Sequence, residues 1–183
     1  MTPTDNEWLV LFYQLPAKGS PARVKAWRRL QRIGAVTLRN SAYVLPNRGD
    51  AREDFEWIKT EIIAMGGQAL VMSAAVLDAA TGQDIVELFR RARGDDFEAV
   101  RGQARALADR SRSRLPKGAA RRRLTQTVRR LRERLREIES IDFFDAPHRL
   151  EAADALDELD RIAKRGQIMV KPSTATACRP MDT

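Results

Sequence analysis

Cysteine and histidine are almost absent from this sequence of 183 residues, which contains one of each, Cys178 and His148. A single cysteine excludes an intrachain disulfide and a cysteine cluster for a metal, and it favours a reducing, cytoplasmic location. A single histidine leaves at most one member for a histidine-based triad or a multi-histidine metal site. We therefore predict no catalytic residue, no metal site and no cofactor.

Long apolar runs and phosphate-binding loops are missing as well. No apolar run approaches the length that crosses a membrane, and the first ten residues, MTPTDNEWLV, carry acids where a signal peptide needs positive charge. The glycines in GDAR and MGGQ match neither of the common phosphate-loop patterns. We therefore expect a chain that is neither exported nor bound to a membrane.

The first part of the chain begins with a strand pattern and a helix pattern. The apolar run WLVLFYQL, residues 8–15, is typical of a strand that is buried on both faces. Ser20 and Pro21 then favour a helix start. Apolar residues follow at three-residue steps, namely Val24, Trp27, Leu30 and Ile33. We expect Trp27 to anchor this helix in the core.

Strand and helix patterns continue to follow one another in residues 36–78. Two short strand patterns flank a turn at residues 39–41, and Asp50 and Glu53 have the spacing of a capping box before a second helix. An apolar strand begins at Ala69. The order strand, helix, two strands, helix, strand is the split βαβ plan. We therefore predict an α+β protein in which residues 7–78 form a ferredoxin-like domain.

Beyond residue 78 the patterns are helical. Thr81 is the expected cap of a long helix that starts near Gln83, and the sequence RGDD at residues 93–96 can bend it. A second helix follows the loop SRSRLPKG, and a third begins at residues 145–147 and stops at Gly166. We predict a bundle of about three helices over residues 81–166 and a flexible tail over residues 167–183.

The second of these helices is the most basic stretch of the chain. Eight arginines occupy the sixteen positions 121–136, with Glu133 as the one acid among them. Apolar residues spaced four, three, four and three apart form one narrow seam, namely Leu124, Val128, Leu131, Leu135 and Ile138. Arg122, Arg129 and Arg136 form a row away from this seam. A second copy could complete so narrow a seam, which makes a homodimer conceivable.

The charge balance decides how that helix is interpreted. The net charge is +8, and residues 101–136 carry fourteen lysines or arginines against two acids. Residues 137–165 carry nine acids against four bases, so the third helix can neutralise the second in part, which is the purely structural alternative. The positive charge that remains after this neutralisation favours a partner that carries phosphate groups. We predict nucleic-acid contacts from Arg121, Arg122, Arg123, Arg129, Arg130, Arg132 and Arg136, and from Arg28, Arg29 and Arg32 of the first helix.

Three segments resemble a known family. They are residues 8–48, which contain QLP and NSAYVLP, the sequence ELFRRAR at residue 87, and IDFFDAPHRLEAADAL at residue 141. Together they resemble the N-terminal domain of ChrB, the regulator of bacterial chromate-resistance operons, over most of residues 7–165. The resemblance implies a transcriptional regulator with operator DNA as partner and chromate as inducer. Longer members carry a C-terminal domain that this sequence does not contain, so we expect that the role of that domain either comes from a separate polypeptide as a further partner or is missing.

The first domain also resembles the middle domain of phenylacetate-degradation repressors and the small CRISPR-associated nucleases. Those nucleases place a metal-binding aspartate after a tyrosine at the end of the first strand, where this chain has Tyr13 and Gln14. An amide lacks the charge that holds Mg²⁺, so we predict that the protein is not an enzyme. A divalent-metal nuclease is the enzyme alternative, and an interaction subunit that binds an acidic protein is the third possibility.

Overall fold

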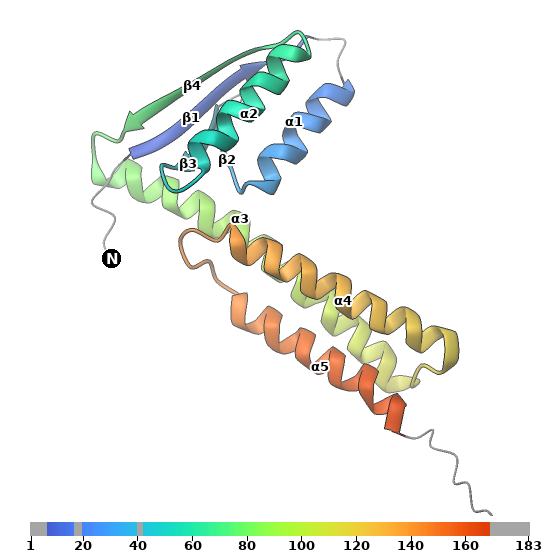
Figure 1. The fold of residues 1–183 in the computed structure, drawn as a ribbon. Coiled ribbons are helices and arrows are strands. Elements are labelled where there is room, and N and C mark those ends of the chain that lie inside the picture. Colours follow the sequence, from blue (N-terminus) through green and yellow to red (C-terminus); the bar gives the residue numbers. More distant parts are fainter. Residues whose placement is uncertain (1–6, 17–19, 40–41, 169–183) are drawn as a thin grey trace, which may run out of the picture.

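The computed structural model describes residues 7–16, 20–39 and 42–168. Its elements in chain order are β1 (Glu7–Gln14), α1 (Ser20–Arg32), β2 (Val36–Arg39), β3 (Ala42–Pro46), α2 (Ala51–Ala64), β4 (Gln68–Ala75), α3 (Ala79–Ser113), α4 (Gly118–Ser140) and α5 (Arg149–Ile168). The sheet with α1 and α2 lies at one end of an elongated molecule, and α3, α4 and α5 extend to the other end (Figure 1). The predicted α+β class, a ferredoxin-like unit followed by helices, is confirmed.

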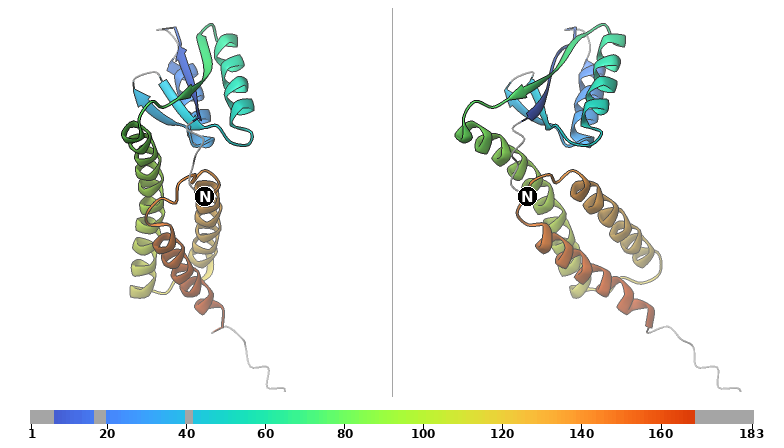
Figure 2. Two further views of the ribbon diagram at one scale, coloured as in Figure 1. Left: turned by 90° about the vertical axis from the view of Figure 1, so that its left-hand side faces the viewer. Right: turned by 60° about the vertical axis from the view of Figure 1, so that its left-hand side comes forward.

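The strands form one antiparallel sheet in the order β2-β3-β1-β4. Helices α1 and α2 lie together on one face of this sheet (Figure 2). Leu9 and Leu11 of β1 are buried on that face, where they share a core with Phe55, Ile58 and Ile62 of α2. Of the turn expected at residues 39–41, Arg39 is the last residue of β2, whereas residues 40 and 41 lie outside the described residues, as does the tail beyond Ile168.

The expected role of Trp27 is wrong. Trp27 is 50% exposed, and α1 faces the sheet instead through Ala26 and Leu30, which are buried. The reason is geometric: at about 100° per residue, a three-residue step falls about 60° short of a full turn. Residues chosen at three-residue steps therefore drift across the helix surface, and Val24 and Trp27 come to lie outside the buried stripe.

Two predicted helix starts also need correction. Asp50 is the N-terminal cap residue of α2, but its side chain makes no capping hydrogen bond. Helix α3 begins at Ala79, ahead of Gln83, because Asp78 is the cap: its carboxylate accepts hydrogen bonds from the backbone N of Thr81 at 2.8 Å and from the Thr81 hydroxyl at 2.8 Å. These bonds lower the pKa of Asp78. The helix then runs through residues 93–96 without a break.

The three long helices form a bundle with a core of its own. The predicted seam of α4 is buried throughout and meets Phe97, Val100 and Ala104 of α3 and Leu156 and Leu159 of α5. Helix α5 begins at Arg149, later than the expected start at residues 145–147, because Asp145 and His148 have φ angles of +51° and +72° that a right-handed helix does not allow. It continues two residues past its expected stop at Gly166. The seam is therefore filled from within the chain, and it no longer argues for a second copy.

The loop between α4 and α5 contacts both the sheet unit and the long helix α3. Phe143 and Phe144 pack around Phe89 of α3, with ring centroids 5.9 and 5.3 Å away. Arg90 Nε donates a hydrogen bond to the carbonyl oxygen of Phe144 at 2.9 Å, and Arg48 Nη1 donates one to that of Phe143 at 3.4 Å. The segment IDFFDAP therefore fixes the bundle to the sheet unit.

Candidate nucleic-acid interface

Helix α4 turns its apolar seam inward, and this orientation determines where its arginines lie. Because the seam occupies one narrow stripe, residues about half a turn away must face solvent. We define the outer face of α4 as five exposed arginines, namely Arg122, Arg123, Arg129, Arg130 and Arg136. Arg122, Arg129 and Arg136 follow one another at intervals of about 10.5 Å, from a rise of ~1.5 Å per residue.

The arginines on the flanks of α4 are engaged with neighbouring helices. Arg132 Nη2 lies 2.9 Å from Asp157 Oδ1 and 2.9 Å from Asp160 Oδ2, both on α5. Arg134 Nη2 lies 3.3 Å from Asp96 Oδ1 on α3. The acidic third helix therefore reaches one flank of α4 through Arg132, which was among the predicted nucleic-acid contacts.

The outer face keeps most of its charge. Within the described part of the chain, no ion pair involves Arg122, Arg123, Arg130 or Arg136, whereas Arg129 Nε lies 3.1 Å from Glu133 Oε1 on its own helix. Arg121, a further predicted contact, is half buried at the start of α4. The purely structural alternative thus accounts for the flanks of the helix and leaves its outer face open to an anion.

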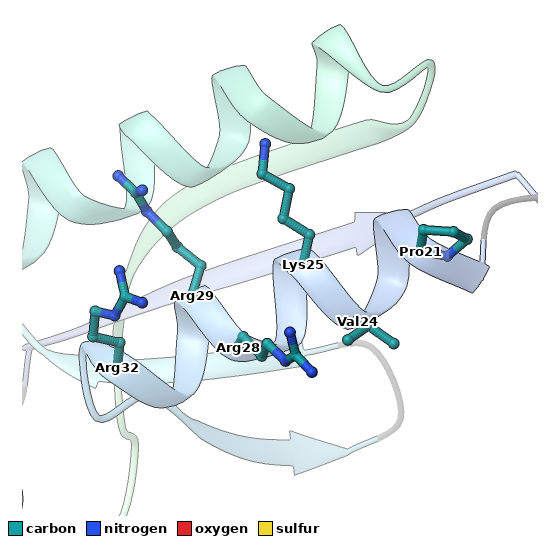
Figure 3. Close-up of a pocket in the computed structure, with 6 residues that line it drawn as sticks. All are labelled: Pro21, Val24, Lys25, Arg28, Arg29 and Arg32. Carbon is teal, nitrogen blue, oxygen red and sulfur yellow. The ribbon is translucent and has the colours of Figure 1, made fainter. Parts of the chain in front are cut away.

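The second predicted set lies on α1, as Figure 3 shows. Arg28, Arg29 and Arg32 line a shallow hollow of about 480 Å³ together with Lys25. This set is partly neutralised by α2, because Lys25 Nζ lies 3.0 Å and Arg29 Nε 4.0 Å from the carboxylate of Glu61. Arg28 and Arg32 take part in no ion pair among the described residues, so this set keeps part of its charge.

The two basic helices meet at the junction between the sheet unit and the bundle. The turn after α1 lies against the residues that follow α4 (Figures 1 and 2). Gly34 has a φ of +77°, and an added Cβ there would lie 2.7 Å from the Cβ of Ile141. This close approach requires glycine, since a real side chain would clash. The C-terminal ends of α1 and α4 therefore lie close together.

A buried arginine at this junction was missed by the sequence reasoning. Arg93 is 3% exposed, and its Nη2 lies 3.1 Å from Asp96 Oδ2, while Nε and Nη1 have no hydrogen-bond partner among the described residues. Burial lowers the pKa of Arg93, although Asp96 opposes that effect. The available signal was an arginine followed by an acid three residues later, but sequence alone does not tell a buried pair from a surface pair.

The position that would hold a metal in the nucleases belongs to Gln14, the last residue of β1, which is exposed. The acids that a nuclease would need are not gathered there: among the described residues, no three His, Cys, Asp or Glu side chains are grouped closely enough to hold a metal ion. Asp50 sits at the start of α2, and Asp5 lies outside the described residues. The tyrosine of the pair is partly buried beside Tyr43, and this burial raises the pKa of Tyr13 to about 12.

Residues 23–166 match the family described as the N-terminal domain of protein ChrB. The chain belongs to the ChrB N-terminal family. A curated relative, protein ChrB of Cupriavidus metallidurans, is 31% identical over 87 residues, which cover 48% of this chain and 27% of that protein. The chain thus matches about a quarter of the length of that relative.

No solved structure matches this ChrB-family chain. None of the helices in the described ranges combines the length and the apolar character that a membrane crossing requires.

Proposed function

We propose that this chain is a cytoplasmic DNA-binding regulator of a chromate-resistance operon, and that the outer face of α4 contacts DNA phosphates. The observation that carries the proposal is the set of exposed arginines that no acid of the described chain neutralises, Arg122, Arg123, Arg130 and Arg136. Membership of the ChrB N-terminal family supports the regulatory role. The chromate link and chromate as inducer rest on the family resemblance.

The geometry suits a phosphate backbone. The row Arg122, Arg129, Arg136 spans about 21 Å at a rise of ~1.5 Å per residue, and guanidinium groups form paired hydrogen bonds to phosphate oxygens. The seam stays buried when this face is occupied, so binding does not require the bundle to open. Phosphate contacts position a protein on DNA but carry no sequence information, so selectivity for an operator must come from further contacts.

The test is the salt dependence of binding to the DNA upstream of the chain's own gene, measured by fluorescence anisotropy or gel shift. If the five arginines of the outer face displace counterions, log K should fall against log salt with a slope of roughly −4 to −5. Replacing Arg122, Arg129 and Arg136 by glutamine should flatten this slope by nearly 3. Adding chromate should release the DNA if chromate is the inducer.

The matched control removes the same charge from the other candidate helix. Arg28→Gln, Arg29→Gln and Arg32→Gln together should change the slope by less than one, because these arginines contact no phosphate when the outer face of α4 is the interface. Far-ultraviolet circular dichroism and thermal melting show whether both triple variants are folded. A folded α4 variant with the unmodified slope would reject the outer face, and a flatter slope in the α1 variant would move the interface to α1.

An interaction subunit is the second candidate, favoured by the same arginines of the outer face of α4 that no acid of the described chain neutralises. The outer face of α4 would then bind an acidic protein. Co-purification that persists after nuclease treatment and disappears in the α4 variant would support this function. Nuclease activity is tested by incubating DNA or RNA with the protein and Mg²⁺ or Mn²⁺, and metal-dependent cleavage would overturn the prediction that the protein is not an enzyme.

A further inference from the structure

The face of the sheet opposite α1 and α2 is covered over part of its length. Side chains alternate along β1, so Trp8, Val10 and Phe12 share this opposite face. At one end of it, the ring of Trp8 stacks on Phe89 of α3 with centroids 5.8 Å apart. Figure 2 shows α3 leaving the sheet at that end. Toward the other end of β1 and along β4, side chains on this face stay exposed in the part of the chain that the structure describes.

Large apolar side chains occupy the uncovered part. Phe12 is 41% exposed, Leu70 54% and Met72 41%. Phe12 stands directly opposite Leu70 in the sheet, and Val10 stands opposite Met72, so the three exposed residues share one face. We call these three residues the sheet patch.

The strands that carry and adjoin the sheet patch have no charged residue on its face. The described residues of β1, β3 and β4 on this face are all uncharged, namely Trp8, Val10, Phe12 and Gln14 of β1, Ala42, Val44 and Pro46 of β3, and Gln68, Leu70, Met72 and Ala74 of β4. Trp8, Val10, Ala42 and Val44 are buried, and Arg39, which is paired with Ala42, lies on β2 at the other edge of the sheet. The whole sequence, by contrast, is 32% charged. An uncharged face of this extent is therefore a local property of the sheet.

The patch continues to an open strand edge. β4 pairs with β1 on one side and ends the sheet on the other, so one row of its backbone N–H and C=O groups has no strand partner. Edge strands are commonly protected from pairing by lysine, proline or inward-pointing charge. β4, with the sequence QALVMSAA, contains none of these.

We propose that the sheet patch and the adjacent edge of β4 form the contact between two copies of this chain. With a net charge of +8, two copies repel each other wherever basic surfaces meet. They approach without that penalty at an uncharged face, and a two-fold axis places an apolar patch on its own equivalent. An acidic partner would find no cation here, whereas a second copy finds matching apolar side chains.

The size of the face sets the strength of the contact. The exposed part lies on two strands spaced ~4.8 Å apart, and about five residues at ~3.3 Å per residue give it a size of roughly 10 by 17 Å. That is on the order of 200 Å² per copy before the edge of β4 is added, below the roughly 800 Å² per partner of a standard stable interface. The dimer should therefore be weak and should dissociate on dilution. This inference does not depend on DNA binding.

The test measures the mass of the full chain by sedimentation equilibrium, from low micromolar to near-millimolar concentration. The unmodified chain should shift from monomer to dimer. Leu70→Lys with Met72→Lys should weaken association more than about tenfold, because a two-fold contact brings four new ammonium groups together. The control, Ile63→Lys with Leu150→Lys, adds the same charge at exposed apolar residues elsewhere and should associate like the unmodified chain.

A second measurement covers the case in which the lysine variant fails to fold. In the unmodified chain, hydrogen exchange of the β4 amides should slow as concentration rises, while exchange in α4 should stay constant. A monomer at every concentration would overturn the proposal, as would undiminished association of a folded lysine variant. Association with unchanged exchange in β4 would place the contact elsewhere and would equally reject it.

Discussion

Helices α1 and α4 both present arginines to solvent, but acids of the neighbouring helices form ion pairs with different parts of the two arginine sets. α1 lies beside α2, whose Glu61 pairs with Lys25 and Arg29 of α1. α4 packs against both α3 and α5, and their acids, such as Asp157, reach its flanks. Arginine content alone therefore does not identify an anion site. What matters is whether an acid of the same fold can reach the arginine.

The two helices also differ in how they are held. α4 buries five aliphatic residues in a continuous seam, whereas α1 buries Ala26 and Leu30 and leaves Trp27 half exposed. The outer face of α4 is thus attached to a well-packed helix. A rigid helix keeps the spacing between its arginines constant, which favours simultaneous phosphate contacts. This reasoning makes the comparison testable by substitutions on both helices.

The largest effect should come from the seam. Leu131→Ala should lower the free energy of unfolding by about 2–5 kcal/mol, because Leu131 is 5% exposed and its removal leaves a cavity between the three helices. Leu150→Ala on α5 is the matched control, since Leu150 is 76% exposed and should change stability by less than ~0.5 kcal/mol. Urea unfolding of both variants measures the difference, and a loss of similar size in both would contradict the packing of α4.

A smaller effect on stability is expected for the substitution of Trp27 on α1. Trp27→Ala should lower the free energy of unfolding by about 1 kcal/mol or less, because half of the side chain already faces water. Leu30→Ala, on the same helix and fully buried, should lower it by about 2–5 kcal/mol. Thermal or urea unfolding ranks the two variants. The reverse order would mean that α1 faces the sheet through Trp27 after all.

For these two helices, the spacing of apolar residues determines how well the buried face could be predicted from the sequence. The four-three spacing of α4 stays on one face of a helix, so its buried residues and outer arginines were predictable. The three-residue spacing of α1 drifts, and small residues such as Ala26, which mark the true contact, give little apolar signal. The order of strands and helices was predictable because each pattern is local.

Other features depend on contacts between distant residues and could not be predicted. The pairing of Arg132 with α5 links positions 25 and 28 residues apart in sequence. The burial of Arg93 and the docking of Phe143 and Phe144 follow from the placement of the α4–α5 loop on the sheet unit. Local patterns carry no information about such placements. The division of the arginines into engaged and open ones therefore required the structure.

The smallest expected effects give the sharpest comparison, because they separate two arginines of one helix. Arg132→Gln should lower the free energy of unfolding by about 0.5–1 kcal/mol, since its ion pairs with α5 are solvent-exposed, and should leave the salt slope of DNA binding unchanged. Arg136→Gln should do the opposite: unfolding should change by less than ~0.5 kcal/mol, and the slope should flatten by about 0.9.

Both variants lose one positive charge from the same helix, so net charge cannot explain a difference between them. Urea unfolding and the salt titration, performed on each variant, give four values. If both variants flatten the slope equally, DNA responds to the total charge of α4, and the distinction between flank and outer face has no functional meaning. If the slope flattens for Arg136→Gln alone, the acids of α5 have already removed Arg132 from the interface, and the fold itself selects which arginines remain for phosphate.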